Sequence, residues 1–239
     1  MTVSDWRQIH AHILELEEEG LVSRTFRRLD SARQQAILRA ILDEAVERGP
    51  TSINIKKVAE RAGVSVGSLY VYFRNREGLL TFAVELCVRF IVDDLGQFRS
   101  LLPSLRMRDA MKAYLIGGIE WSQTQLGFVQ FFARAAYLGD PEVADRVVKP
   151  VAATFREMVE EILTRALSRG EIRPDVDFDA TTRIVNALTI VVVDSLLLPH
   201  LNGYLQVSVP EMPQARILDA LLDLICQGIG VEEKAGVSA

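Results

Sequence analysis

Apolar residues recur at every third or fourth position along most of this 239-residue chain, which is the spacing of one face of an α-helix. No segment alternates apolar and polar residues for long enough to predict a β-strand. The pattern therefore predicts an all-α fold. The expected helices cover residues 5–20, 31–48, 55–62, 66–73, 77–100, 103–122, 126–138, 141–168, 178–198 and 214–227, with a bend at Pro150 in the eighth.

Residues 31–73 carry the sharpest start and stop signals of the chain. Asp30 or Ser31 can cap the first helix of this segment, and Gly49-Pro50 ends it. Asn54 can cap the next helix. These signals predict three short consecutive helices, preceded by a connector that reads SRTFRRLD.

The last two of these helices have the composition of a helix-turn-helix. Gly63 supplies the left-handed residue that a tight turn requires, and Ser65 can cap the second helix. Leu69, with Val58 and Val64, is expected to fill the wedge between the two helices. A motif of this kind places its second helix in the major groove of DNA.

The run from Val58 to Leu80 reads VAERAGVSVGSLYVYFRNREGLL. From Ile37 to Leu80, about a fifth of the chain, the sequence resembles the N-terminal domain of the TetR family of bacterial transcriptional regulators. The run agrees with the family pattern in both spacing and residue type. One departure is Arg76, where the family usually has Lys; Arg keeps the charge and presents it with a different geometry.

We expect the recognition helix, residues 66–73, to carry the contacts with DNA. Small residues at its start let backbone amides approach a phosphate, and the resemblance implies that two tyrosines contact phosphates and thymine methyl groups. Packing of a tyrosine between helices, and capping alone for Asn54, are the alternatives. The predicted DNA-binding residues are Thr51, Asn54, Ser65, Gly67, Ser68, Tyr70, Tyr72, Arg74 and Arg76.

Charge is distributed unevenly along the chain. The net charge is −5, yet residues 24–80 hold eleven Lys and Arg against six Asp and Glu, while the rest holds sixteen against twenty-six. A basic module on an acidic body is expected where one end of a protein meets a polyanion. Arg24, Arg27 and Arg28 lie just ahead of residue 31. They can reach DNA phosphates or a minor groove, or form a solvated linker.

Residues 77–230 are predicted to form a helical body rich in aromatic residues. The resemblance implies a cavity for a small molecule between its helices, whereas an aromatic stripe is otherwise part of a core. Polar residues within apolar runs are candidates for orienting a ligand, because an unpartnered buried charge is costly. An ion pair of Arg134 with Glu120, or an exposed position, is the alternative. The candidate ligand-binding residues are Tyr114, Glu120, Trp121, Gln123, Phe128, Phe131, Phe132, Arg134, Phe155, Asn186 and Asp194.

The last two predicted helices are more apolar than one small core requires. The resemblance implies that they pair across a two-fold axis into a four-helix bundle, and a dimer would also add the affinity that one short recognition helix lacks. Burial within a single chain is the alternative. The predicted dimer-interface residues are Ile190, Val193, Leu197, Leu218, Leu221 and Ile225.

Other function classes find little support in the sequence. Cys87 and Cys226 lie far apart in apolar helical contexts and are expected to be reduced. His10 and His12 diverge on a helix, and no catalytic triad, phosphate loop or metal motif is present. The N-terminus lacks a signal-peptide pattern, and the apolar stretch from Ile184 to Leu198 is shorter than a membrane span. We therefore predict a cytoplasmic, non-enzymatic protein without cofactor, metal or membrane.

Together these features predict a homodimeric repressor that a small, largely apolar effector releases from a palindromic operator in double-stranded DNA. The expected domains are an N-terminal extension with an Arg-rich arm (1–30), a helix-turn-helix domain (31–76), an effector-binding and dimerisation domain (77–230) and a tail (231–239). One alternative is a DNA-organising or partner-regulated protein of the same fold without an effector, which a tightly packed body would favour. Another, an enzyme with a vestigial helix-turn-helix, lacks a catalytic grouping.

Overall fold

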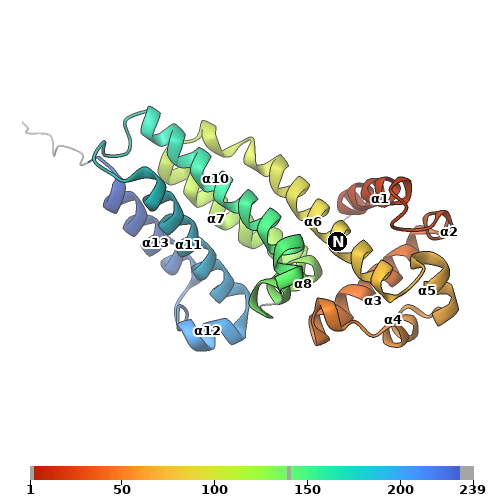
Figure 1. The fold of residues 1–239 in the computed structure, drawn as a ribbon. Coiled ribbons are helices and arrows are strands. Elements are labelled where there is room, and N and C mark those ends of the chain that lie inside the picture. Colours follow the sequence, from red (N-terminus) through yellow and green to blue (C-terminus); the bar gives the residue numbers. More distant parts are fainter. Residues whose placement is uncertain (1–2, 139–140, 232–239) are drawn as a thin grey trace, which may run out of the picture. The chain divides into compact units, whose positions relative to one another are not determined.

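The computed structural model describes residues 3–138 and 141–231, and within them every element is helical apart from one isolated bridge between Ile172 and Gly230. The predicted all-α fold class is confirmed (Figure 1). The elements are α1 (Val3–Glu18), α2 (Arg24–Arg27), α3 (Ser31–Arg48), η1 (Pro50–Ser52), α4 (Ile55–Ala62), α5 (Val66–Phe73), α6 (Arg76–Arg99), η2 (Leu102–Ser104), α7 (Met107–Thr124), α8 (Leu126–Leu138), α9 (Pro141–Val143), η3 (Ala144–Val148), α10 (Lys149–Ser168), α11 (Phe178–Leu197), α12 (Pro199–Leu205) and α13 (Gln214–Ile229).

Capping residues explain why the early helices begin and end where the sequence predicts. The Asp30 carboxylate accepts the N–H of Arg33 at 2.9 Å and caps α3. Asn54 accepts the N–H of Lys56 at 3.0 Å and caps α4. Each bond satisfies an amide that has no partner inside its own helix. Gly49, with a φ of 94°, ends α3 as predicted.

Two short helices stand where the sequence predicts connecting segments. The first is α2, which begins after Ser23, whose hydroxyl accepts the N–H of Phe26 at 3.3 Å. The second is α12, which begins at Pro199 directly after α11 ends. Proline stops the preceding helix as expected, and it also starts the next one because the first turn of a helix tolerates a missing N–H.

A π-helical turn, η3, lies just before Pro150, where we expected a bend. A proline cannot donate to the carbonyl four residues earlier, and its ring crowds that carbonyl. A π-helical turn widens the helix by one residue and moves the hydrogen bonds out of that register. The helix predicted over residues 141–168 is consequently divided into α9, η3 and α10.

The chain packs as two compact units, which we describe separately. Unit 1 comprises Met1–Leu95 and Thr124–Ala152, and unit 2 comprises Gly96–Gln123 and Ala153–Ala239. Unit 1 therefore contains the first five helices, most of α6, and the segment from α8 to the start of α10. These units follow backbone contacts; the functional division of the chain at residues 30, 76 and 230 stays a prediction.

The core of unit 1 forms around the first part of α6, where Phe82 and Phe90 are fully buried. Phe26 of α2 packs edge-on against Phe82 with ring centroids 5.5 Å apart. Figure 1 shows α1 and α2 alongside α5 and this part of α6. The predicted N-terminal extension is thus a folded layer of unit 1.

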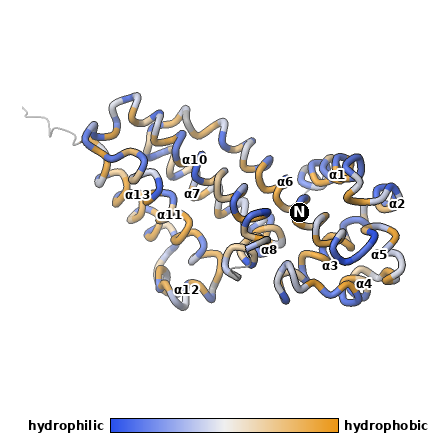
Figure 2. The backbone as a smooth tube through the Cα atoms, in the orientation of Figure 1, coloured by the Kyte–Doolittle hydropathy of each residue, from blue (hydrophilic) through white to orange (hydrophobic). Residues whose placement is uncertain are grey.

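The core of unit 2 is made by α7, α10, α11 and α13, which run alongside one another in Figure 1. Met111 of α7, Ile162 of α10 and Leu222 of α13 are all buried, and the bands of hydrophobic and hydrophilic residues along these helices are visible in Figure 2. Arg99 binds Glu161 at 2.6 Å and Glu157 at 2.7 Å. This guanidinium lowers the pKa of the Glu161 carboxyl through its hydrogen bonds.

Candidate nucleic-acid interface

The turn between α4 and α5 has the geometry that the sequence predicts. Gly63 ends α4 in the left-handed region, with a φ of 66°, and the N–H of Val64 donates to the carbonyl of Ala59 at 3.0 Å. The Ser65 hydroxyl accepts the N–H of Ser68 at 2.9 Å and caps α5. Capping accounts for the Ser65 side chain, and it fixes where the recognition helix begins.

One side of α5 is open to solvent. We call four exposed residues the recognition stripe: Gly67, Tyr70 and Val71 of α5, and Arg74, which directly follows the helix. The side chains of Tyr70 and Val71 are 45% and 57% exposed. Tyr70 and Val71 follow Gly67 by three and four positions, which places these three residues on one side of the helix. Three predicted DNA-binding residues lie on the stripe, and Ser68 is half-buried beside it. A major groove would meet this side of α5.

Tyr72 is not on the recognition stripe. Its side chain is only 9% exposed, and its ring lies 5.7 Å from that of Phe26 and 6.2 Å from that of Phe73, measured between centroids. Two positions along an α-helix turn a side chain to roughly the opposite side. We therefore correct the expectation that both tyrosines contact DNA: the packing alternative describes Tyr72, and Tyr70 is the exposed aromatic residue.

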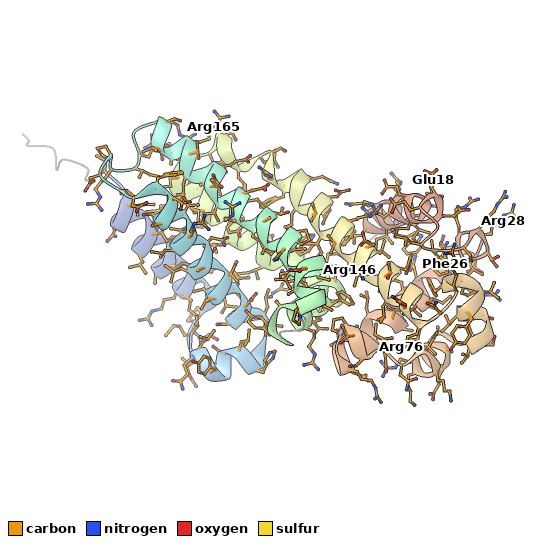
Figure 3. All side chains as sticks on the ribbon, viewed as in Figure 1. Glu18, Phe26, Arg28, Arg76, Arg146 and Arg165 are labelled. Atoms are coloured by element: carbon orange, nitrogen blue, oxygen red, sulfur yellow. The ribbon has the colours of Figure 1, made fainter. Side chains whose placement is uncertain are left out.

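Arg76 binds carbonyls of the protein itself. Its Nε donates to the carbonyl of Ile53 at 3.0 Å, and its Nη2 donates to the carbonyl of Thr51. Both carbonyls belong to the segment between α3 and α4, so Arg76 fixes the start of α6 to the start of the helix-turn-helix (Figure 3). Arg76 is also exposed, and its phosphate contact stays a prediction beside this bracing role.

Glu44 is a residue of this region that our sequence interpretation missed. Its side chain is fully buried, and its carboxylate lies 2.9 Å from Arg48 and 3.6 Å from Arg61. It also accepts the N–H of Asn54 at 3.3 Å. The carboxylate therefore joins α3 to the start and the end of α4. The signal was present in the sequence, because Glu44 lies on the apolar stripe of α3 with a cation four positions on.

The candidate ligand-binding residues are divided between the two units. Those in unit 1 are Phe128, Phe131, Phe132 and Arg134. Those in unit 2 are Tyr114, Glu120, Trp121, Gln123, Phe155, Asn186 and Asp194. The two groups are consequently considered one at a time.

In unit 1 the aromatic candidates contribute to the core. Phe131 is fully buried, and Phe128 stacks on Phe90 with ring centroids 4.5 Å apart. Arg134 donates to the carbonyl of Val46 at 2.8 Å and to that of Glu47 at 3.1 Å. It stabilises the C-terminal end of α3, and its ligand contact stays a prediction. A cavity of about 300 Å³ lies in this unit, lined by Leu38, Arg39, Leu42, Asp43, Thr124, Gln125, Leu126, Gly127, Phe128 and Gln130.

In unit 2 the structure brings Tyr114 together with polar residues of α11. Burial raises the pKa of Tyr114 to about 12; its hydrogen bond with Thr189 acts against that rise and Asp194 adds to it. The Asn186 Oδ1 is buried and accepts no hydrogen bond from any described residue, and such an atom is costly unless a polar group meets it.

The other candidates of unit 2 are more open to solvent. Glu120 and Gln123 are exposed, and their ligand contacts stay a prediction. Trp121 and Phe155 are half-buried. A second cavity of about 300 Å³ lies between α7 and α13 and contains none of the candidates; its lining residues are Lys112, Leu115, Ile116, Gln214, Ala215, Leu218, Asp219 and Leu222.

The predicted dimer-interface residues differ in burial. Leu218, Leu221 and Ile225 of α13 are already buried in the single chain, which favours the alternative of burial within the monomer for these three. The predicted residues of α11, namely Ile190, Val193 and Leu197, are half-buried.

Other apolar side chains of the same two helices are exposed. Ile184 of α11 is 59% exposed, Val191 is 38% exposed and Leu224 of α13 is 63% exposed; we call these three residues the apolar face. Helix α11 is also long and apolar enough to cross a membrane, although we had judged its apolar stretch too short, and 22% of the relevant 18-residue window is buried. A helix at a protein interface meets the same criteria.

The described residues offer no metal site, because no group of three or more His, Cys, Asp or Glu side chains within them could hold an ion. His12 is buried, 3.2 Å from Glu15 and 3.4 Å from Asp93. Both cysteines are free, and burial raises the pKa of the Cys87 thiol well above its usual range. These groups are accounted for by packing and pairing within the protein.

Comparison with known proteins identifies the helix-turn-helix segment. The family model described as "Bacterial regulatory proteins, tetR family" matches residues 37–81. Among curated proteins, the HTH-type transcriptional repressor KstR2 of Mycolicibacterium smegmatis is 26% identical over 164 residues, which are 66% of this chain and 77% of that protein. The HTH-type transcriptional regulator BetI of Yersinia pestis is 30% identical over 91 residues, 38% of this chain and 46% of that protein.

Solved structures share the fold over most of the chain. A TetR family transcriptional regulator from Chloroflexus aurantiacus superposes with a TM-score of 0.61 at 18% identity, covering 88% of this chain and 99% of that one. The transcriptional regulator FadR from Bacillus subtilis, in complex with stearoyl-CoA, superposes with a TM-score of 0.56 at 15% identity, covering 82% and 99%. At these identities the likeness to both structures is one of fold.

Proposed function

Because the chain belongs to the TetR family of bacterial regulatory proteins, we propose that it is a homodimeric repressor of transcription whose release from DNA is controlled by a small, largely apolar molecule. The recognition stripe carries this proposal. It presents Tyr70 and Arg74 on a short helix whose start is fixed by the Ser65 cap and whose neighbour α4 is held by the buried Glu44. A preset element of this kind can enter a groove without rearrangement.

DNA recognition would divide between the base edges and the phosphates. The start of α5 has small residues, Gly67 and Ser68, which let the backbone approach the groove. Tyr70 can contact a thymine methyl group or a phosphate, and Arg74 has the charge for a phosphate. Two copies related by a two-fold axis would place their recognition helices one helical turn apart, roughly 34 Å, on a near-palindromic operator.

The apolar face supports the homodimer. Its three side chains are large, apolar and exposed in the single chain, and a second copy would remove them from water. Burying apolar surface contributes about 25 cal/mol per Å², so an interface of ordinary size has an ample driving force. We infer that α11 and α13 pair with the same helices of the partner.

The body of the protein supports an apolar effector. Tyr114, Thr189 and Asp194 form a polar group inside unit 2, and the Asn186 Oδ1 lacks a donor among the described residues. A ligand with an apolar chain and a polar end fits such a surrounding. Acyl-CoA thioesters are the first compounds to test, because FadR of the same fold was solved with stearoyl-CoA. The effector would act through its different affinity for the DNA-bound and released states.

Fluorescence anisotropy tests the proposal. The full chain is titrated onto a labelled duplex from the intergenic region upstream of its gene, and then acyl-CoA thioesters of graded length are added. We expect saturable, salt-sensitive binding in the cytoplasmic range of ionic strength, and release by one class of ligand. Lack of binding to any such duplex would contradict the regulator itself. Binding that no apolar ligand changes would contradict only the effector, and would favour a partner-regulated protein of this fold.

A further inference from the structure

The N-terminal extension, residues 3–28, is a firmly attached part of unit 1. Ile9 and Ile13 of α1 are fully buried. Arg89 of α6 binds Glu19 through two parallel hydrogen bonds of 2.8 Å and 2.7 Å, which is the strong, bidentate form of this pair. The extension is therefore not a loose arm, and its residues occupy fixed positions.

Helix α2 braces the end of the recognition helix. The N–H of Ser23 donates to the carbonyl of Tyr72 at 2.9 Å, which satisfies a carbonyl that the end of α5 leaves without a helical partner. The ring of Phe26 lies 5.7 Å from that of Tyr72 and 5.2 Å from that of Phe73. On its other side α2 is held by Gln34 of α3, whose Nε2 donates to the Phe26 carbonyl at 3.1 Å.

Two arginines at α2 are exposed while the helix itself is held. Arg24 and Arg28 are four positions apart and therefore lie on the same side, opposite the inward-pointing Phe26; Figure 3 shows Arg28 directed away from the ribbon. Neither guanidinium has a hydrogen bond or ion pair with a described residue. Arg27 differs, because it forms an ion pair with Glu17. The side chain of Arg74, at the end of the recognition stripe, is exposed and unpaired within the described chain as well.

We propose that Arg24 and Arg28 bind backbone phosphates of DNA beside each half-site, so that α2 is a second contact element of the DNA-binding surface. This inference rests on the proposed function. Two exposed, unpaired guanidinium groups on a helix that contacts the end of α5 match a polyanion, and a guanidinium binds phosphate oxygens through two parallel hydrogen bonds. Because the bonds of α2 to α3 and α5 fix its position, binding costs little backbone freedom. Contacts with phosphates add affinity on any sequence and carry no base specificity.

The test is the salt dependence of DNA binding by the full chain. The double variant R24A/R28A is compared with wild type on the labelled intergenic duplex and on a mixed-sequence duplex of the same length. The matched control is K149A/R165A, which removes two exposed charges from α10. We expect R24A/R28A to bind both duplexes at least about tenfold more weakly at about 0.1 M salt. The slope of log affinity against log salt should fall by about 0.9 for each phosphate that the variant no longer neutralises.

The outcomes separate this inference from the function on which it rests. If wild type and R24A/R28A bind with equal affinity and equal salt slope, α2 does not contact DNA, although the protein still binds an operator. If K149A/R165A weakens binding as much as R24A/R28A, the effect is one of total charge and the inference is wrong. If wild type binds no DNA, the proposed function fails and the inference fails with it. Circular dichroism confirms that the variants are folded.

Discussion

Helices α5 and α11 leave different kinds of surface uncovered. Helix α5 has eight residues; Ser65 caps its start and α2 braces its last turn. The recognition stripe along it combines a tyrosine, a valine and an arginine. The twenty residues of α11 are mostly apolar, and only 22% of their most apolar window is buried. A mixed, rigid surface suits a polar partner such as DNA, whereas the surface of α11 suits a second apolar surface.

The difference also concerns how each helix is held in place. The recognition helix depends on neighbours that lie far away in sequence, chiefly Phe26 and Ser23 of the extension. Helix α11 is long, so most of its backbone N–H and C=O groups are hydrogen-bonded within the helix itself. Its exposed apolar side chains do not contribute to the stability of the single chain. Changes at the extension should therefore unfold unit 1, whereas changes at the apolar face should alter assembly and leave the fold intact.

The largest expected effect is that of Phe26→Ala. Its fully buried ring contacts Tyr72, Phe73 and Phe82, and removal of such a ring lowers the free energy of unfolding by about 3–5 kcal/mol. Trp6 lies in unit 1 and Trp121 in unit 2, so fluorescence in a Trp121→Phe background reports urea unfolding of unit 1 alone.

Phe26→Leu is the matched control for that substitution. It keeps most of the apolar volume and should lose clearly less stability than the alanine variant. Equal midpoints for the two variants would show that α2 does not support the recognition helix through this ring.

The next effect is that of charges on the apolar face. Ile184→Asp combined with Leu224→Asp should convert the dimer to a monomer, because a dimer would bury both carboxylates without partners. Operator affinity should fall about a hundredfold or more, since each half-site would bind alone. The control is Leu101→Asp, at a residue of unit 2 that is 64% exposed and lies outside both helices. Light scattering coupled to size-exclusion chromatography gives the mass; a double variant that stays dimeric would contradict this interface.

A smaller effect separates the two tyrosines of α5. Tyr70→Ala should weaken operator binding by about 1–2 kcal/mol, roughly tenfold, and leave stability nearly unchanged, because the ring is exposed. Tyr72→Ala should destabilise unit 1 by about 3 kcal/mol or more, because its ring is packed among Phe26 and Phe73. Anisotropy and urea unfolding are both measured on each variant. Loss of affinity in Tyr72→Phe, with full stability, would restore a DNA contact to the Tyr72 hydroxyl.

The sequence predicted the helix-turn-helix best because its signals are local. Caps such as Asp30, Asn54 and Ser65, and the turn at Gly63, act within a few residues of where they stand. Short α2 was missed because it has only a Ser cap and one buried ring, and its stability comes from contacts with α5. Propensity cannot reveal a helix that tertiary packing creates.

The partners of polar side chains were the least predictable part of the candidate site. From the sequence we predicted that Arg76 contacts DNA and that Arg134 contacts a ligand. In the structure both side chains bind backbone carbonyls. Which carbonyl lies within reach is decided by tertiary packing, and the pattern of residues carries no such information. Helix α13 is a similar case. Its helical period correctly predicts an apolar side, but it does not show whether that side packs against the same chain or against a second copy.

The smallest effect at neutral pH is that of Tyr114→Phe, which tests a buried polar residue of unit 2 against the exposed apolar face of the same unit. Loss of the hydrogen bond with Thr189 should lower the free energy of unfolding by about 1 kcal/mol at pH 7.

The pKa of Tyr114 is raised to about 12 in the folded protein, from about 10 in an unfolded chain, so its stabilising contribution is complete below about pH 10. That contribution is lost as the pH rises from about 10 to about 12, because the unfolded chain releases the proton first. The stability gap between wild type and variant, followed by Trp121 fluorescence in a Trp6→Phe background, should therefore narrow over this interval. A gap that stays constant up to about pH 12 would mean that Tyr114 is open to water and unsuited to orient a buried ligand.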